Sequence, residues 1–261
     1  MIDIGINLTN TRFDKDRDEV ILNAKLNGVN GLLVTGTNIL ESQKAVNLCE
    51  KHSGYLCSTA GVHPHDADNV QSDYLDCIEK LTESIYVKAI GECGLDFNRN
   101  FSTADNQINV FSNQIELAAK LNLPLFLHQR DAFDLWYKML SPYFDKVPAM
   151  IAHCFTGSIN ELQQCLDAGM YIGITGWLCD ERRGQELRAD VHMIPLERLL
   201  IETDAPYLTP RTIRPKPKSS RNEPSYLSYI VDTIADLTDY SAKQIREQTE
   251  YNSRRIFNWT C

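Results

Sequence analysis

The chain has 261 residues, of which 43% are hydrophobic and 23% charged, so it has enough apolar mass for one large folded core. Its net charge of −9 excludes a protein that coats duplex nucleic acid, because that mode of binding needs a broad basic face. No apolar run approaches the ~18 residues of a membrane span and no signal-peptide pattern is present, so we expect a cytoplasmic protein without membrane contact.

Eight short apolar runs recur along the chain, each followed by a polar or glycine-containing turn and, in most cases, by an amphipathic stretch. This order is typical of repeated βα units. Because eight parallel strands close a barrel, we expect a single-domain α/β fold, a (β/α)8 TIM barrel over residues 1–261. The predicted strands cover 2–8, 29–35, 56–62, 86–92, 124–128, 149–153, 170–175 and 199–204.

The apolar runs alone do not distinguish a barrel from an open, doubly wound sheet, since both cover their strands on two faces. An open sheet of the nucleotide-binding kind has a GxGxxG loop after its first strand, whereas residues 5–9 read GINLT. The eight cysteines form no CxxC pair, and we expect them to be reduced.

Helical periodicity fills the spaces between the strands. Between residues 105 and 121, apolar side chains recur at spacings of three to four, as on one face of a helix. A loop rich in proline and basic residues, 206–224, follows the last strand, and helices near 226–237 and 242–257 come after it. The other predicted helices are 14–26, 40–52, 73–81, 132–140, 160–168 and 183–191.

Four of the predicted strands end in side chains that bind metals. The fourth ends at Glu92, the fifth at His128, the sixth at His153 and the eighth at Asp204. One such residue alone is commonly a solvated group or a helix cap. The carboxyl ends of barrel strands, however, all open into one mouth, so we expect these four side chains to share a divalent cation.

Two imidazoles and two carboxylates suit a cation that polarises an electrophile and activates a water molecule. Asp204 either ligates a second cation or takes a proton from this water, and the sequence leaves both roles open. We expect Glu92 and Asp204 to be the catalytic carboxylates. Glu202, two residues before Asp204, is either a supporting group or an ordinary polar residue.

Further polar side chains fall at the same mouth. His63 and His65 follow the third strand, and Arg130 follows His128; imidazole and guanidinium groups there suit a phosphate or other oxyanion. The alternative for each is an ordinary turn or an ion pair, as it also is for Asp96, Asn98 and Arg99. Cys93 and Cys154 each follow an expected ligand, and strand alternation predicts that they pack away from the site.

The Pro-rich loop carries five cations within eleven residues. A solvated loop and a small footprint for a polyanion explain this equally well. Aromatic side chains near the strand ends would either pack in the core or stack on a base; they are Phe97, Trp177 and Tyr207. The cations are Arg211, Arg214, Lys216, Lys218 and Arg221.

Eight short segments of the sequence, in the same order, resemble the TatD family of metal-dependent deoxyribonucleases, and the resemblance extends over essentially the whole chain. The matching segments are GVHPHD (61–66), IGECGLDF (90–97), HQRDA (128–132), HCFTG (153–157), YIGITGW (171–177), DERRG (180–184), IETDAPYL (201–208) and RNEP (221–224).

The resemblance implies a barrel of the metallo-dependent hydrolase type and 3′→5′ exonuclease activity on single-stranded DNA and RNA, in DNA repair or fragmentation. It implies Mg²⁺ as the working ion, although two histidines would suit Mn²⁺ or Zn²⁺ better. Its motifs assign Glu92, His128 and His153 to the metal, Asp204 to the acid of the eighth strand, and His63 and His65 to the substrate side. We expect Arg130 and Arg221 to bind substrate as well, with strand 3′ ends as the substrate of a monomeric enzyme.

One departure concerns the first strand, where many family members have an HxH pair that helps to hold a second metal. This chain has Gly5 and Asn7 there. A one-metal site is therefore possible, and so is a non-catalytic binder. Hydrolysis of a small-molecule amide, ester or lactone is the alternative enzymatic reading, because related barrels catalyse it.

Overall fold

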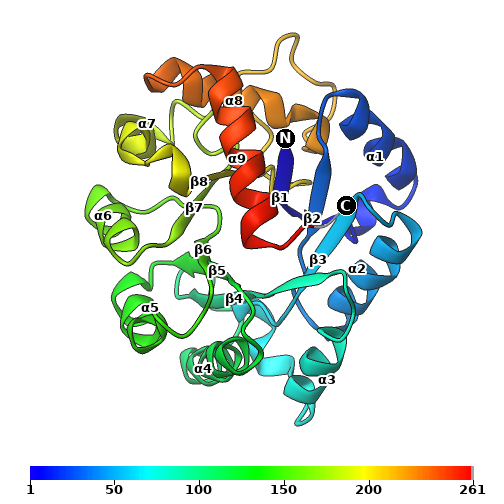
Figure 1. Cartoon of the computed structure of the whole chain (residues 1–261), viewed down its shortest axis with the longest axis vertical. Helices are drawn as coiled ribbons and strands as arrows, with labels where there is room; N and C mark the ends of the chain where they lie inside the picture. The colour runs from blue at the N-terminus through cyan, green and yellow to red at the C-terminus, as the bar shows by residue number, and fades with distance from the viewer. Residues whose placement is uncertain (260–261) are drawn as a thin grey trace.

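The computed structural model describes residues 1–259, and within them eight parallel strands form one sheet in the order β1 to β8. The strands lie at the centre of the molecule, and the helices α1 to α8 surround them in chain order (Figure 1). The strands are β1 (Ile2–Ile6), β2 (Gly31–Val34), β3 (Leu56–Ala60), β4 (Val87–Asp96), β5 (Leu125–Arg130), β6 (Met150–Ala152), β7 (Tyr171–Ile174) and β8 (Leu199–Ile201).

Helices follow seven of the strands directly and cover the outside of the barrel, which confirms the predicted fold. The helices are α1 (Arg17–Leu26), α2 (Ile39–Lys51), α3 (Tyr74–Leu81), α4 (Ala104–Leu121), α5 (Phe133–Leu140), α6 (Ile159–Asp167), α7 (Gln185–Asp190), α8 (Leu227–Leu237) and α9 (Ala242–Ile256). Local sequence fixes several of their starts: α6 and α9 each begin with a capping box, at Ser158 and Ser241.

The seam between β1 and β8 closes the barrel through a few backbone contacts. Ile6 forms a parallel bridge with Ala205. The backbone N–H of Asp204 donates to the carbonyl of Gly5 at 2.8 Å, and the N–H of Asn7 donates to the carbonyl of Ala205 at 2.8 Å. Gly5, Asn7 and Asp204 all lie along this seam. Closure of the barrel therefore brings Gly5 and Asn7 of the first strand next to Asp204, which follows the last strand.

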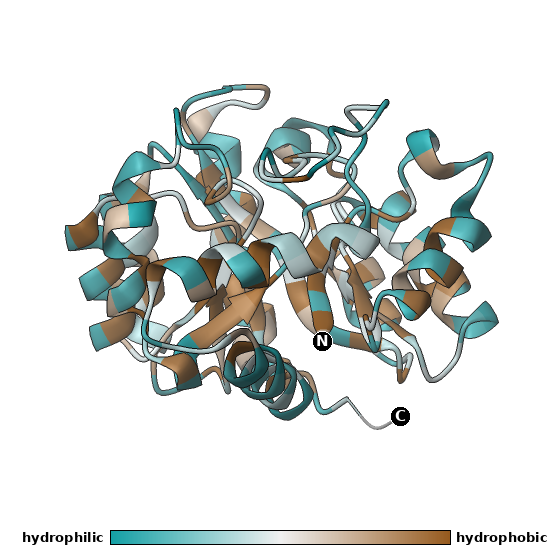
Figure 2. Ribbon diagram, turned by 90° about the horizontal axis from the view of Figure 1, so that it is seen from above, coloured by the Kyte–Doolittle hydropathy of each residue, from teal (hydrophilic) through white to brown (hydrophobic). Residues whose placement is uncertain are grey.

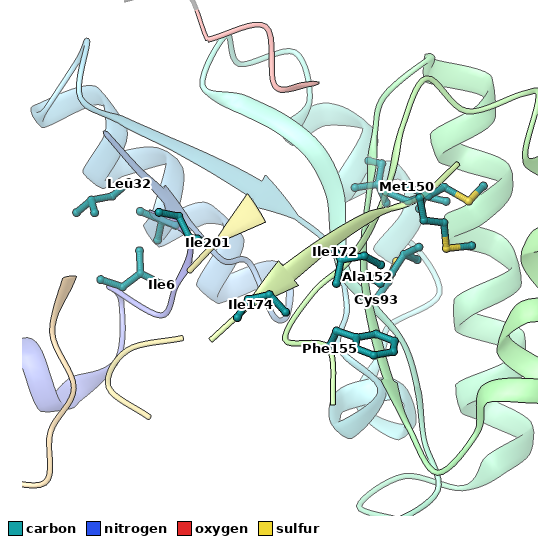
Figure 3. Packing of buried hydrophobic residues seen from close by; sticks show 14 of the residues in the cluster. Ile6, Leu32, Cys93, Met150, Ala152, Phe155, Ile172, Ile174 and Ile201 are labelled. Atoms are coloured by element: carbon teal, nitrogen blue, oxygen red, sulfur yellow. The ribbon is translucent and has the colours of Figure 1, made fainter. Parts of the chain in front are cut away.

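Two apolar layers hold the barrel together. Outward-facing strand residues pack against the helices, as Ile6, Ile172 and Ile201 illustrate (Figure 3). A second cluster fills the interior and receives at least one side chain from every strand, together with Phe257 and Trp259 from the segment after α9. Figure 2 shows the apolar strands in the middle and polar surfaces outside. None of the helices within residues 1–259 is long and apolar enough to cross a membrane.

The ends of β4 and β8 differ from the predicted ends. The predicted strand 86–92 continues to Asp96, because residues 93–96 pair in register with 127–130 of β5. The predicted strand 199–204 stops at Ile201. Glu92 therefore lies within a strand, whereas Asp204 lies beyond one.

Candidate active site

A cavity of about 830 Å³ opens at the carboxyl ends of the strands. Its lining contains all four predicted ligands, Glu92, His128, His153 and Asp204. Their sequence separation is thus bridged by the barrel, as the sequence analysis predicts. The predicted substrate-side residues His63, His65 and Arg130 also line the cavity, as do Asp96, Arg99 and Phe101.

Three imidazoles surround one carboxylate oxygen at the centre of this cavity. The Nδ1 atom of His128 lies 2.9 Å from Oε1 of Glu92. The Nε2 atoms of His63 and His153 lie 3.3 Å and 3.6 Å from the same oxygen. Glu92 is 6% exposed, so a charged carboxylate is buried here with basic groups as its neighbours.

The backbone before Glu92 explains how a mid-strand residue reaches the cavity. The register of β4 against β5 shifts between Ile90 and Cys93. Gly91 has a φ of 140°, which L-residues rarely adopt, and any Cβ there would collide with the carbonyl oxygen of Phe126. The irregularity turns Glu92 into the mouth and requires glycine before it.

Glu202 fixes the orientation of His153. Its Oε2 lies 2.5 Å from Nδ1 of His153, and its Oε1 accepts a hydrogen bond from the backbone N–H of Cys154 at 2.6 Å. Glu202 is completely buried. With Nδ1 engaged, Nε2 of His153 is the nitrogen that faces Glu92, so Glu202 has the supporting role that a metal-bound histidine requires.

Asp204 occupies the opposite side of the cavity from β4. The Nδ2 amide of Asn7 donates to its Oδ1 at 3.0 Å. Ligand atoms of His153, Cys154 and Asp204 lie within 4.8 Å of one another, and so do those of His63, Glu92 and His128. The short His153–Glu92 distance joins these two groups.

Asp96 adds a further carboxylate that the sequence analysis leaves undecided. Its Oδ2 lies 2.7 Å from Nε2 of His65 and 3.6 Å from Nε2 of His128. Backbone N–H groups of Asn98 and Arg99 donate to its other oxygen. Asp96 therefore connects the loop after β4 to His65 and lies close to His128.

The charges clustered in the site lower the pKa of Glu92 and raise those of His153 and Asp204. Burial alone would raise the pKa of Glu92, but the imidazoles of His63, His153 and His128 hold it well below its usual range. Burial also opposes the charged form of His153, yet Glu202 and Glu92 outweigh it and raise its pKa to about 10. For Asp204, burial and the charges of Glu92 and Glu202 raise the pKa to about 7.

The donor set fits a divalent cation. The buried Nε2 of His128 has no hydrogen-bond partner among residues 1–259, although an imidazole nitrogen in this position normally has one. It lies 3.6 Å from Oδ2 of Asp96, and nitrogen with carboxylate oxygen is a common ligand set for first-row divalent metals. The structure thus supports a divalent metal and leaves its identity open.

Two arginines of the sequence analysis have different surroundings. Arg130 is exposed and lines the cavity. Arg221 does not line it: its guanidinium donates to both carboxylate oxygens of Asp16, at 2.8 and 2.6 Å, and to Glu223 at 2.8 Å. The structure brings Arg130 to the mouth and ties Arg221 to the neighbouring loop instead.

Sequence reasoning misplaced one cysteine. Alternation predicts that Cys154 points away from His153, but Cys154 lines the cavity and its φ is 47°. Because β6 ends at Ala152, the alternation rule no longer applies at residue 154. Cys93, within β4, is fully buried in the core as expected.

Comparison with known proteins agrees with this geometry. Residues 2–258 match the family described as TatD related DNase. The chain belongs to this family. A TatD relative from Erwinia tasmaniensis, named 3′-5′ ssDNA/RNA exonuclease TatD, is 53% identical over 99% of this chain and 100% of its own length. A relative of the same name from Klebsiella pneumoniae is 51% identical over 98% of this chain and 97% of its own length.

Solved structures of the TatD family share the fold. A TatD-family hydrolase from Entamoeba histolytica superposes with a TM-score of 0.90 at 29% identity, covering 100% of this chain and 98% of that one. A TatD homologue from Escherichia coli K12 gives a TM-score of 0.89 at 24% identity, covering 99% and 98%. The second likeness, at its lower identity, supports the barrel fold alone.

Proposed function

We propose that this protein is a metal-dependent exonuclease that removes nucleotides from the 3′ ends of single-stranded DNA and RNA. The observation that carries the proposal is the buried carboxylate of Glu92 among three imidazoles, opposite Asp204, in one cavity. Full-length identity of 53% to a relative with that printed activity supports the substrate class. Repair or fragmentation of DNA in the cytoplasm is the cellular role we propose with it.

Glu92, His128, His153 and Asp204 are the residues that we assign to the cation, with His63 in the same donor group. A divalent cation bound there would act as a Lewis acid toward the phosphate and would lower the pKa of the water that serves as nucleophile. Asn7 fixes one oxygen of Asp204, which leaves the other to accept a proton from the attacking water.

The phosphate charge needs donors on the outer side of the cavity. His65 and Arg130 line this side, and a guanidinium matches the geometry of phosphate oxygens. An exonuclease needs only one strand end in its pocket, which reconciles nucleic acid as substrate with a net charge of −9. We propose Mg²⁺ as the ion and a monomer as the working unit.

The direct test incubates a 5′-labelled 20-nucleotide single strand with the protein and Mg²⁺. We expect a ladder that shortens stepwise from the 3′ end, and no products with EDTA. Parallel reactions with Mn²⁺ and Zn²⁺ rank the ions, and light scattering checks the monomer. Shortening that persists in EDTA would contradict the metal-dependent mechanism, and cleavage of a lactone or ester without any strand shortening would favour the small-molecule hydrolase.

Glu92→Gln keeps the side chain's size and removes its charge. We expect kcat to fall by about 10³-fold or more, because a central ligand is lost. Glu116→Gln, on the exposed face of α4, is the matched control and should retain wild-type turnover. In thermal unfolding, Mn²⁺ should raise the Tm of the control and leave that of Glu92→Gln unchanged.

A further inference from the structure

A buried acid on the turn that follows β7 contacts three arginines. Asp180 lies 3.4 Å from Nε of Arg182, 2.9 Å from Nε of Arg183 and 3.9 Å from Nε of Arg211. Arg211 comes from the Pro-rich loop, so the contact joins two segments that are distant in sequence. We refer to Arg182, Arg183 and Arg211 as the arginine cluster.

The arginine cluster carries more positive charge than the neighbouring carboxylates can neutralise. The side chain of Asp180 is 2% exposed, whereas those of Arg182, Arg183 and Arg211 are 67%, 55% and 53% exposed. Asp180 and its exposed neighbour Glu181 offset two of these three cations, so one positive charge remains in excess at the surface. Arg182 and Arg183 donate hydrogen bonds to Asp180 through Nε, and these contacts orient their guanidinium groups, whose terminal nitrogens form the fork that binds phosphate.

The cluster adjoins the active-site cavity. The guanidinium of Arg183 lies over the ring of Trp177 at 4.6 Å, and both residues line the cavity that contains Glu92 and Asp204. Tyr207, near the start of the loop that carries Arg211, lines it as well. On a chain with a net charge of −9, this concentration of cations beside the cavity is where a polyanion would be attracted.

We propose that the arginine cluster binds backbone phosphates of the single strand on the 5′ side of the bond that is cut. The inference rests on the proposed exonuclease function. With the 3′-terminal nucleotide in the cavity, the remainder of the strand must leave across the rim in the 5′ direction. The cluster gives this segment a phosphate subsite that reads no base and serves DNA and RNA alike.

The experiment compares the wild type with the double variant Arg182→Ala/Arg211→Ala, which leaves the cavity-lining Arg183 in place. Substrates are a 20-nucleotide strand and bis(4-nitrophenyl) phosphate, a small diester with no 5′ extension. We expect the ratio of kcat/KM for the strand to that for the diester to fall about tenfold, mainly through a higher KM. The slope of log KM against log salt should flatten by about 1.4, roughly 0.7 for each lost contact on a single strand.

A matched control removes cations elsewhere. Lys138 and Lys243 are exposed and do not line the cavity, and their double alanine variant should behave as the wild type with both substrates. An unchanged ratio and salt slope in Arg182→Ala/Arg211→Ala would overturn the subsite. Absence of strand shortening by the wild type, with diester cleavage intact, would instead overturn the exonuclease function.

A structural fault in the double variant would reduce cleavage of both substrates together. The single charge reversal Arg182→Glu then decides, because this side chain is the most exposed of the three. A strand-to-diester ratio that falls with Arg182→Glu supports the subsite, and an unchanged ratio overturns it.

Discussion

Gly5 and Glu202 are complementary residues at the base of the active site. A Cβ atom at position 5 would collide with Oε2 of Glu202 and would lie 3.2 Å from Nδ1 of His153. The HxH pair of many family members would put a histidine at this position. In this chain Oε2 of Glu202 fills the space beside Gly5, so glycine at position 5 allows Glu202 to reach His153.

Gly5→Ala should therefore destabilise the protein and slow it. We expect a loss of about 1–3 kcal/mol in the free energy of unfolding, because the added methyl group overpacks a buried site. We also expect at least a tenfold lower kcat, since Glu202 must move away from His153. Thermal unfolding and diester hydrolysis measure the two effects. Adding Glu202→Asp, which shortens the acid, should restore part of the lost Tm; no recovery would argue against the collision.

Glu202→Gln tests the charge of the acid without changing its size. The raised pKa of His153 depends on Glu202, so its pKa in the metal-free protein should fall when this charge is removed. Affinity for Mn²⁺ should fall by about 10–100-fold, because the supporting carboxylate is lost. NMR titration of the imidazole and calorimetry with Mn²⁺ give these values, and an unchanged His153 pKa would be inconsistent with the role assigned to Glu202.

For single residues, the sequence predicts which side chains lie together at the site. It does not predict the direction of every side chain, because that direction depends on the local backbone conformation. Glu92, His128, His153 and Asp204 were expected from strand ends, and the structure places all four in one cavity. The direction of Cys154 was wrong, because a positive φ reverses the alternation. Such a dihedral angle leaves no pattern in the residue types of a single sequence.

The Pro-rich loop, 206–224, is attached to the segment after β1 by side-chain contacts near each of its ends. Arg221 joins Asp16, before α1, to Glu223, and its guanidinium lies 5.1 Å from the ring centre of Phe13 in η1 (Thr11–Phe13). Near the other end, Asn10 donates to the hydroxyl of Tyr207 at 3.2 Å. The loop is thus attached to the segment that follows β1.

Arg221→Ala should act on stability more than on substrate binding. We expect the free energy of unfolding to fall by about 1–2 kcal/mol, because a bidentate and partly buried ion pair is lost. Urea unfolding measures this change, and strand hydrolysis measures KM. Lys218→Ala, in the same loop, is the control and should change neither. A large rise in KM at unchanged stability would return Arg221 to the substrate side.

Hydrophobic patterning predicts the order and number of the elements better than their ends. The eight apolar runs correspond to β1–β8, and the helical patterns to the helices around them. The end of β4 was missed by four residues, since its extension depends on pairing with residues 127–130 of β5, most of which are polar and therefore carry no apolar strand pattern. Pairing between strands is a tertiary property and is only weakly encoded in either strand alone.

At the scale of the whole molecule, a buried acid reinforces barrel closure. Oδ1 of Asp3 accepts a hydrogen bond from the backbone N–H of Thr203 at 2.9 Å, and Oδ2 accepts one from its hydroxyl at 2.5 Å. Asn222 in turn donates to the carbonyl of Thr203 at 2.9 Å. These contacts connect β1, the segment after β8 and the end of the Pro-rich loop.

The stability of the barrel should depend on pH through Asp3. Burial raises its pKa from 3.8 to about 7, despite the hydrogen bonds from Thr203 and Gly5. The folded protein therefore binds this proton more tightly than the unfolded chain, so the stability that it contributes is fully present below about pH 4 and is lost as the pH rises to about 7. Asp3→Asn stays neutral, and its free energy of unfolding relative to the wild type should increase between pH 4 and 8. Urea unfolding across this range measures the difference, and a pH-independent difference would contradict it.

The aromatic residues after α9 have a consequence for how the protein is made. Phe257 and Trp259 pack among interior side chains of the strands, and the Trp259 ring lies where a side chain on Gly31 would be. During synthesis all eight strands leave the ribosome before these two rings do. The apolar interior of the strands consequently remains open until these two rings have also left the ribosome and packed against it.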